Sequence, residues 1–180
     1  MHKEYEQPLL IDVQKNIPEG VEAKALGEDI RRLCISQPFA VLATQGKAIT
    51  NASLISFAVS LDLKYLVFAT PINSGKFELI AMDENVSILV DDRTLQQDNI
   101  NQISALTIRG KGKILTDKIE RLKWTELLTE KHPNLETFVI APTSAIILVE
   151  VIKYHYVKKF QEVWDWDPNG EVKYEVERKI

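Results

Sequence analysis

Residues 65–83 read YLVFATPINSGKFELIAMD. The first part, residues 65–70, is apolar and rich in residues favoured in β-strands, so it predicts a strand that ends at Thr70. Residues 71–74 break this pattern, and residues 76–83 have the apolar spacing of a short helix. Ser74 stands where the N-cap of that helix is expected. The segment therefore predicts a strand, a tight connection and a helix in quick succession.

Lys76 falls in the first turn of the predicted helix, where its charge opposes the helix dipole. A helix N-terminus carries about half a positive charge and several unpaired N–H groups, so it favours anions. A phosphate bound by Lys76, by the hydroxyls of Thr70 and Ser74 and by backbone N–H groups would offset the misplaced charge. A solvated surface lysine fits the same short pattern, so the local sequence leaves both interpretations open.

Polar and apolar residues alternate in residues 51–56, NASLIS, which precede the strand that ends at Thr70. If the two strands pair, this segment lies beside the predicted phosphate site. Its backbone would then offer N–H and C=O groups to the polar edge of a flat ring, while apolar side chains pack against the face of the ring. An ordinary half-buried strand has the same alternation.

The rest of the chain is typical of an antiparallel β protein with few helices. We predict helices over residues 21–34, 76–83 and 117–131, and strands over residues 39–44, 48–60, 65–70, 86–90, 105–115 and 144–160, the last as one strand or two. Gly110 and Gly112 predict a bulge or a tight bend, and Asp117 with Glu120 resembles a capping box. Short strands without regular helix alternation favour a barrel.

The composition, charge and hydropathy of the chain limit the classes of protein to which it can belong. The chain has 180 residues, of which 45% are hydrophobic and 27% charged, so we expect one globular domain over residues 1–180 with a core over 21–166. The net charge of −4 does not favour nucleic acid. Without an apolar N-terminal segment or a run of roughly 20 apolar residues, no export or membrane insertion is expected, and the cytoplasm is the expected compartment.

The residues most often found in catalytic or metal sites are explained here by core packing or by a solvated surface. Cys34 is the single cysteine, which excludes an internal disulfide, and it lies on an apolar helix stripe typical of a core. No Cys/His cluster has zinc-site spacing, so no metal site is expected. The basic row of Arg109, Lys111 and Lys113 is typical of a solvated face, although it is the next phosphate candidate. No set of residues with the spacing of a catalytic triad is present, so no catalytic residue is named.

With these segments in place, residues 28–166 resemble the pyridoxamine 5′-phosphate oxidase-like family, the FMN-binding split β-barrels. The segment PFAVLAT (38–44) resembles the family's opening strand, and residues 53–94 resemble its cofactor-binding core. ALTIRGKGKILTD (105–117) resembles the following strand, and residues 131–151 and 158–167 resemble the closing segments. The ordered set of segments carries the resemblance. It implies a mainly β fold, a barrel with flanking helices.

The resemblance also implies FMN bound at the interface of a homodimer. The family's flavin-contacting and phosphate-binding positions correspond to Asn51, Ser53, Leu54, Ile55, Ser56, Ala69, Thr70, Ser74 and Lys76. Pyridoxamine phosphate oxidases proper carry basic residues at the positions of Asn51, Ser56 and Gly75. Because this chain lacks them, the resemblance does not extend to pyridoxal phosphate synthesis.

The leading functional hypothesis is an FMN-dependent oxidoreductase that acts on an unknown small molecule. In such a protein the flavin carries the hydride chemistry, and the chain supplies binding and orientation. The alternatives are a flavin- or haem-binding module without turnover, and a deazaflavin-dependent reductase. His155 is the candidate axial ligand for haem. Trp164 and Trp166 fit a ring contact, a dimer interface or core packing equally well.

Overall fold

A computed structural model describes residues 21–96, 99–159 and 162–169 of the chain. Its strands are β1 (Phe39–Gly46), β2 (Ile49–Val59), β3 (Tyr65–Pro71), β4 (Asn85–Asp91), β5 (Ala105–Ile114), β6 (Ser144–Lys158) and β7 (Glu162–Trp166). Its helices are α1 (Val21–Ser36), α2 (Gly75–Met82), α3 (Lys118–Lys131) and α4 (Glu136–Ile140), with short 3₁₀ turns η1 (Ile100–Gln102) and η2 (Pro133–Leu135).

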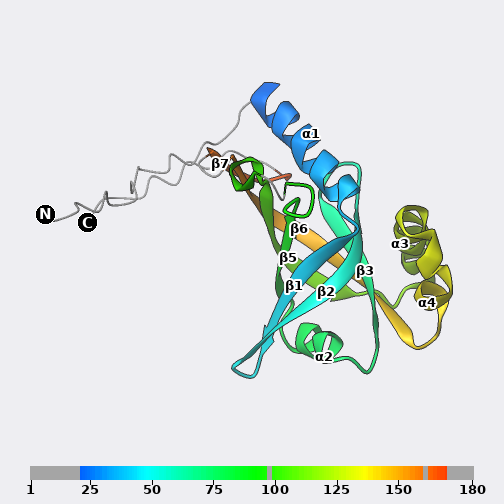
Figure 1. The fold of residues 1–180 in the computed structure, drawn as a ribbon. Coiled ribbons are helices and arrows are strands. Elements are labelled where there is room, and N and C mark those ends of the chain that lie inside the picture. The colour runs from blue at the N-terminus through cyan, green and yellow to red at the C-terminus, as the bar shows by residue number, and fades with distance from the viewer. Residues whose placement is uncertain (1–20, 97–98, 160–161, 170–180) are drawn as a thin grey trace, which may run out of the picture.

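Six of the strands close into an antiparallel barrel (Figure 1). They lie in the order β3–β2–β1–β4–β5–β6, and pairing of β3 with β6 completes the ring. Strand β7 extends this sheet by pairing with the far end of β6. The predicted mainly β barrel is therefore confirmed, and its flanking helices lie at the ends and on one side (Figure 1).

Apolar side chains fill the barrel and a second layer outside it. Helix α1 covers one end of the barrel and buries Leu26, Ile30 and Leu33 in the interior cluster. Helix α2 lies at the other end (Figure 1) and buries Ile80 in the same cluster. The second cluster lies between α3 and α4 and the outer face of β3 and β6. The barrel therefore has one wall and both ends covered by helices, while the wall formed by β1, β4, β5 and the first part of β2 is left uncovered by the described residues.

Lys131, at the end of α3, contacts both the end of α1 and the barrel. Its ammonium donates to the carbonyls of Cys34 at 2.7 Å and Gln37 at 2.8 Å, and lies 3.9 Å from the ring centre of Phe57. The side chain of Cys34 is fully buried, and burial raises the pKa of its thiol to about 12. The interpretation of Cys34 as a core residue is confirmed, since such a thiol is a poor nucleophile.

Three local predictions can be compared directly with the structure. The bulge is confirmed, because the register between β5 and β6 shifts between Arg109 and Gly110. Asp117 caps α3 by accepting from the N–H of Glu120 at 2.8 Å. The reciprocal half of the capping box is absent among the described contacts, and the Glu120 carboxylate instead pairs with Lys113 at 3.1 Å.

The strand predicted over residues 144–160 is present as one long strand over residues 144–158, and residue 160 lies outside the described residues. Neither β7 nor α4 was expected. The ring of Trp166 stacks on Tyr154 with centroids 5.5 Å apart, and the Tyr154 hydroxyl donates to the carbonyl of Leu63 at 2.6 Å. Trp164 and Trp166 are half-buried and both pack against the interior cluster, as the core-packing interpretation expects.

Within the described ranges, no helix is both long enough and apolar enough to cross a membrane.

Candidate functional site

Strands β2 and β3 separate along half of their length. Strand β2 pairs with β1 from Ile49 to Ser56, but it pairs with β3 only from Phe57 to Val59. Residues 49–56 therefore have no strand partner on their second side within the described chain. In an antiparallel strand every second residue directs its N–H and C=O to such a free side. The strand pairing of the barrel wall is thus broken here, and we call this break, which is edged by unpaired backbone groups, the opening.

The pairing of β2 with β3 bears on the place of residues 51–56. From the sequence, these residues lie beside the predicted phosphate site if their strand pairs with the one that delivers Thr70. The strands do pair, but the pairing stops at Phe57 and Phe68, before either segment is reached. Strand β3 continues to Pro71 by pairing with β6 on its other side. Residues 51–56 and 69–70 therefore edge the opening from opposite sides.

The predicted residues of β2 alternate between the two faces of the barrel wall. On the inner face, Asn51 donates from Nδ2 to the hydroxyl of Ser53 at 3.0 Å, and Ile55 is buried in the core. On the outer face, Leu54 is 65% exposed and Ser56 is half-buried. A ligand in the opening would meet polar side chains on the inside and Leu54 on the outside.

At the end of β3, two hydroxyls meet. Thr70 is 1% exposed, and its Oγ1 lies 2.8 Å from Oγ of Ser74. Ala69 precedes Thr70 and packs on the opposite face, against the cluster beneath α3. Only the backbone of Ala69 could therefore contact a ligand in the opening. The hydroxyls of Thr70 and Ser74 form a hydrogen-bonded pair.

The predicted N-cap is present at the start of α2. Ser74 has extended backbone angles, and its Oγ accepts from the N–H of Phe77 at 3.4 Å. The N–H groups of Gly75 and Lys76 precede the first helical hydrogen bond, which runs from Glu78 to the Ser74 carbonyl. These two N–H groups remain available to an anion.

Space and charge at this helix start also suit an anion. Apart from its two chain neighbours and the backbone of its own helix, no described atom lies within 4 Å of the place where a side chain on Gly75 would begin. The Lys76 side chain is half-buried and makes no ion pair with any described residue. The two hydroxyls, two N–H groups and one ammonium together can bind a phosphate group.

Thr44 is a polar residue of this region that the sequence did not single out. It lies on β1 directly opposite Asn51 and is 3% exposed. Its hydroxyl is buried without a hydrogen-bond partner in the described structure. Buried polar atoms are usually hydrogen-bonded. The alternation of Ala40, Leu42 and Thr44 on one strand was the available signal, since it places Thr44 inside.

The other candidates lie elsewhere. Lys111 and Lys113 pair with Glu84 at 2.6 Å and Glu120 at 3.1 Å, as expected of a solvated row. His155 is half-buried on β6, and its Nδ1 lies 2.6 Å from Oδ1 of Asp165 on β7. The sequence did not predict this pair, because β7 was not expected.

A protein-family model and a set of solved structures are similar to this chain. The family model for pyridoxamine 5′-phosphate oxidase matches residues 26–158, which is most of the described chain. No curated protein sequence matches the chain significantly.

Solved structures share the fold at low sequence identity. General Stress Protein 26 from Bacillus anthracis is 20% identical with a TM-score of 0.57, over 73% of this chain and 93% of that one. A FAD-binding protein from Mesorhizobium loti is 11% identical with a TM-score of 0.58, over 72% and 91%. A heme binding protein from Mycobacterium smegmatis is 13% identical with a TM-score of 0.70, and the match covers 79% of this chain and 58% of that protein. Similarity at these identities concerns the fold alone.

Proposed function

Because the chain belongs to the pyridoxamine 5′-phosphate oxidase family, we propose that it binds FMN in the opening between β2 and β3 and acts as an FMN-dependent oxidoreductase. The observation that carries this proposal is the unpaired edge of β2, which runs opposite the end of β3. An edge of backbone donors and acceptors suits the polar rim of a flavin ring. The hydroxyls and helix start after β3 suit the phosphate of FMN.

Each group of residues has a distinct role in this proposal. The backbone of residues 51–56 holds the ring, and Asn51, Ser53 and the unpartnered hydroxyl of Thr44 offer further polar contacts. Thr70, Ser74 and Lys76 hold the phosphate. When bound, the flavin supplies the hydride chemistry, while the chain binds and orients it. The substrate is a small molecule that enters beside the ring.

FMN titration tests the proposal directly. We expect purified protein to be yellow, and added FMN to lose fluorescence as it binds with a dissociation constant of about 1 µM or tighter. Mass spectrometry of the small molecule released on denaturation would distinguish FMN from FAD and from a deazaflavin. If neither FMN nor another flavin binds at micromolar concentration, the proposal is wrong.

We further propose that the uncovered wall of the barrel forms a homodimer interface. Leu54, Val41 and Leu89 lie side by side on adjacent strands, facing outward, and Thr107 continues the row. Phe39, at the start of β1, is 53% exposed. An apolar row of this kind is typical of a surface that packs against another protein. A second copy would also cover the face of the flavin that the opening leaves exposed.

Replacing Leu54 by glutamate tests this interface. We expect light scattering to show a dimer for the parent protein and a monomer for Leu54→Glu, because the row would carry a buried charge. FMN affinity should fall at least about ten-fold in the variant, if the partner covers the ring. Leu61→Glu is the matched control, since Leu61 is 80% exposed in the connection between β2 and β3. A parent protein that is monomeric with flavin bound would contradict the proposal.

Haem binding without turnover is the second candidate function, and one observation favours it. The Nδ1 atom of His155 is held by the Asp165 carboxylate at 2.6 Å, and this carboxylate also pairs with Lys153 at 3.2 Å. A carboxylate behind a histidine orients the ring and leaves Nε2 to bind a metal. We expect a Soret shift on haem titration that His155→Ala abolishes. A titration without any shift removes this candidate.

A further inference from the structure

A cavity of about 240 Å³ opens at the end of the barrel that α1 covers. It lies between α1, the connection from β4 to β5, and the end of β6. The flavin site proposed above lies by α2, at the opposite end (Figure 1). This volume is many times what a single ordered water needs. It therefore has room for a small organic molecule.

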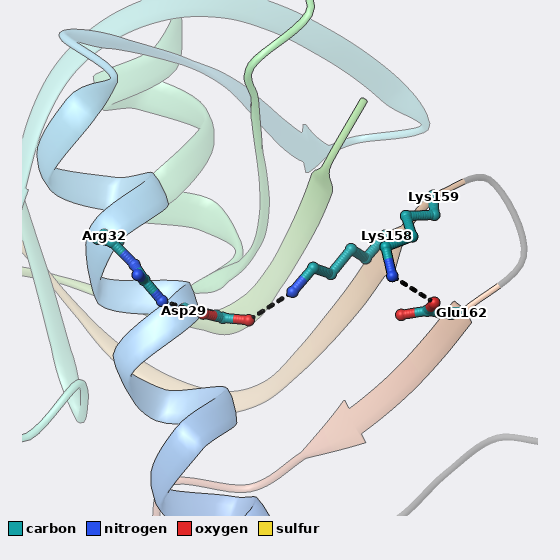
Figure 2. A network of polar contacts seen from close by, with 5 residues as sticks. All are labelled: Asp29, Arg32, Lys158, Lys159 and Glu162. Atoms are coloured by element: carbon teal, nitrogen blue, oxygen red, sulfur yellow. Dashed lines mark hydrogen bonds and ion pairs between the residues drawn. The ribbon is translucent and has the colours of Figure 1, made fainter. Parts of the chain in front are cut away.

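Two cations that share one carboxylate line this cavity. The Lys158 ammonium lies 2.7 Å from Oδ2 of Asp29, and Arg32 pairs with the other oxygen of the same carboxylate. Figure 2 shows Asp29 between the two cations. One carboxylate thus serves two cations, and both retain unused N–H donors. The hydrogen bond to Asp29 raises the pKa of Lys158, so its ammonium stays charged. The unused donors of the two cations can bind a further carboxylate.

A buried phenol, Tyr156, and a second carboxylate, Asp92, also line the cavity, and Tyr156 lies two residues before Lys158 on the same face of β6. Tyr156 is 4% exposed, and burial raises the pKa of its hydroxyl, while a hydrogen bond with the Ser104 side chain acts in the opposite direction. The phenol therefore keeps its proton at neutral pH. Oδ1 of Asp92 accepts from the N–H of Ser104 at 2.7 Å. Its second oxygen makes no hydrogen bond to the described residues, so it can accept from a ligand.

We propose that this cavity binds a small zwitterion, an α-amino acid with a short side chain. Its carboxylate lies on Arg32 and Lys158, its ammonium lies on Asp92, and the Tyr156 hydroxyl donates to the carboxylate. Leu33 and Leu95, which also line the cavity, contact the side chain. The unpaired oxygen of Asp92, which lines the same cavity as the two cations, distinguishes this site from a simple anion site. The proposal does not depend on flavin binding.

Calorimetric titration with three matched probes tests the charge pattern. L-Alanine has both charged groups, propionate lacks the ammonium, and ethylamine lacks the carboxylate. We expect L-alanine to bind at least about ten-fold more tightly than either of the others. A parent protein that binds propionate as tightly as L-alanine, or binds no L-alanine at about 10 mM, overturns the proposal.

Variants then test which residues bind the carboxylate and which bind the ammonium of the ligand. Arg32→Gln should weaken L-alanine binding at least about ten-fold, and Asp92→Asn should remove the preference for L-alanine over propionate. Arg109→Gln is the matched control, because Arg109 is an exposed arginine on the outer face of β5. Equal weakening by Arg109→Gln rejects the site. FMN affinity should be unchanged by Arg32→Gln, which separates this site from the flavin site. If Asp92→Asn does not fold, the comparison of the three probes on the parent protein still decides.

Discussion

Replacing Gly110 by alanine is expected to destabilise the folded protein by about 3 kcal/mol or more. A Cβ on Gly110 would lie 2.4 Å from the carbonyl oxygen of Glu150 and 2.6 Å from Cγ1 of Val149. The first of these atoms belongs to the backbone of β6, which β3 holds on its other side. The clash therefore cannot be relieved by turning a side chain, and the two strands must separate at the bulge.

Urea and thermal unfolding measure this effect. A loss of about 3 kcal/mol lowers Tm by roughly 6–12 °C in a domain of this size. Gly112→Ala is the matched control on the same strand. Its Cβ would meet only side chains, the nearest being Cγ2 of Ile80 at 3.3 Å, so we expect a loss of about 1 kcal/mol. The explanation fails if Gly110→Ala is no less stable than Gly112→Ala.

Replacing Lys76 by alanine is expected to weaken FMN binding by about 1.5–3 kcal/mol, the scale of a hydrogen bond to a charged group. This corresponds to a factor of about 10–150 in the dissociation constant. Riboflavin lacks the phosphate, so its affinity should hardly change. The fold should survive, because a lysine in the first turn opposes the helix dipole. Fluorescence titration with both ligands measures the difference.

Two further variants support the assignment of the phosphate site. Thr70→Val should weaken FMN binding in the same direction but less, since it removes a neutral donor. Lys118→Ala, which removes an exposed lysine of α3, should have no effect on either ligand. If Lys76→Ala binds FMN as tightly as the parent, the phosphate lies elsewhere. Arg109 is then the next candidate, because Lys111 and Lys113 already pair with carboxylates.

Features that depend on neighbouring residues were predictable from the sequence. The hairpin strands, the cap at Ser74 and the bulge at Gly110 all follow from residue types within a few positions of one another. The same holds for the start of α3 at Asp117. In each case the local preference and the final packing favour the same conformation.

Features that depend on distant strands were not predictable in this way. The alternation in residues 51–56 shows that they form a strand, but it does not show that β3 leaves β2 after Phe57. The contact of His155 with Asp165 requires β7, whose five residues are too few for a clear periodic signal. The sequence shows Thr44 only as a residue of a strand. Its place beside the candidate site depends on its pairing with Asn51.

The position of β6 has a consequence for how the protein is made. Residues 144–150 pair with β3, residues 147–157 pair with β5, and residues 154–158 pair with β7. Until β6 leaves the ribosome, a nascent chain exposes open strand edges on both β3 and β5. These edges carry apolar side chains that have no barrel interior to enter. We therefore expect the barrel to fold in one late step, and nascent chains that stop before residue 144 to aggregate or to depend on chaperones.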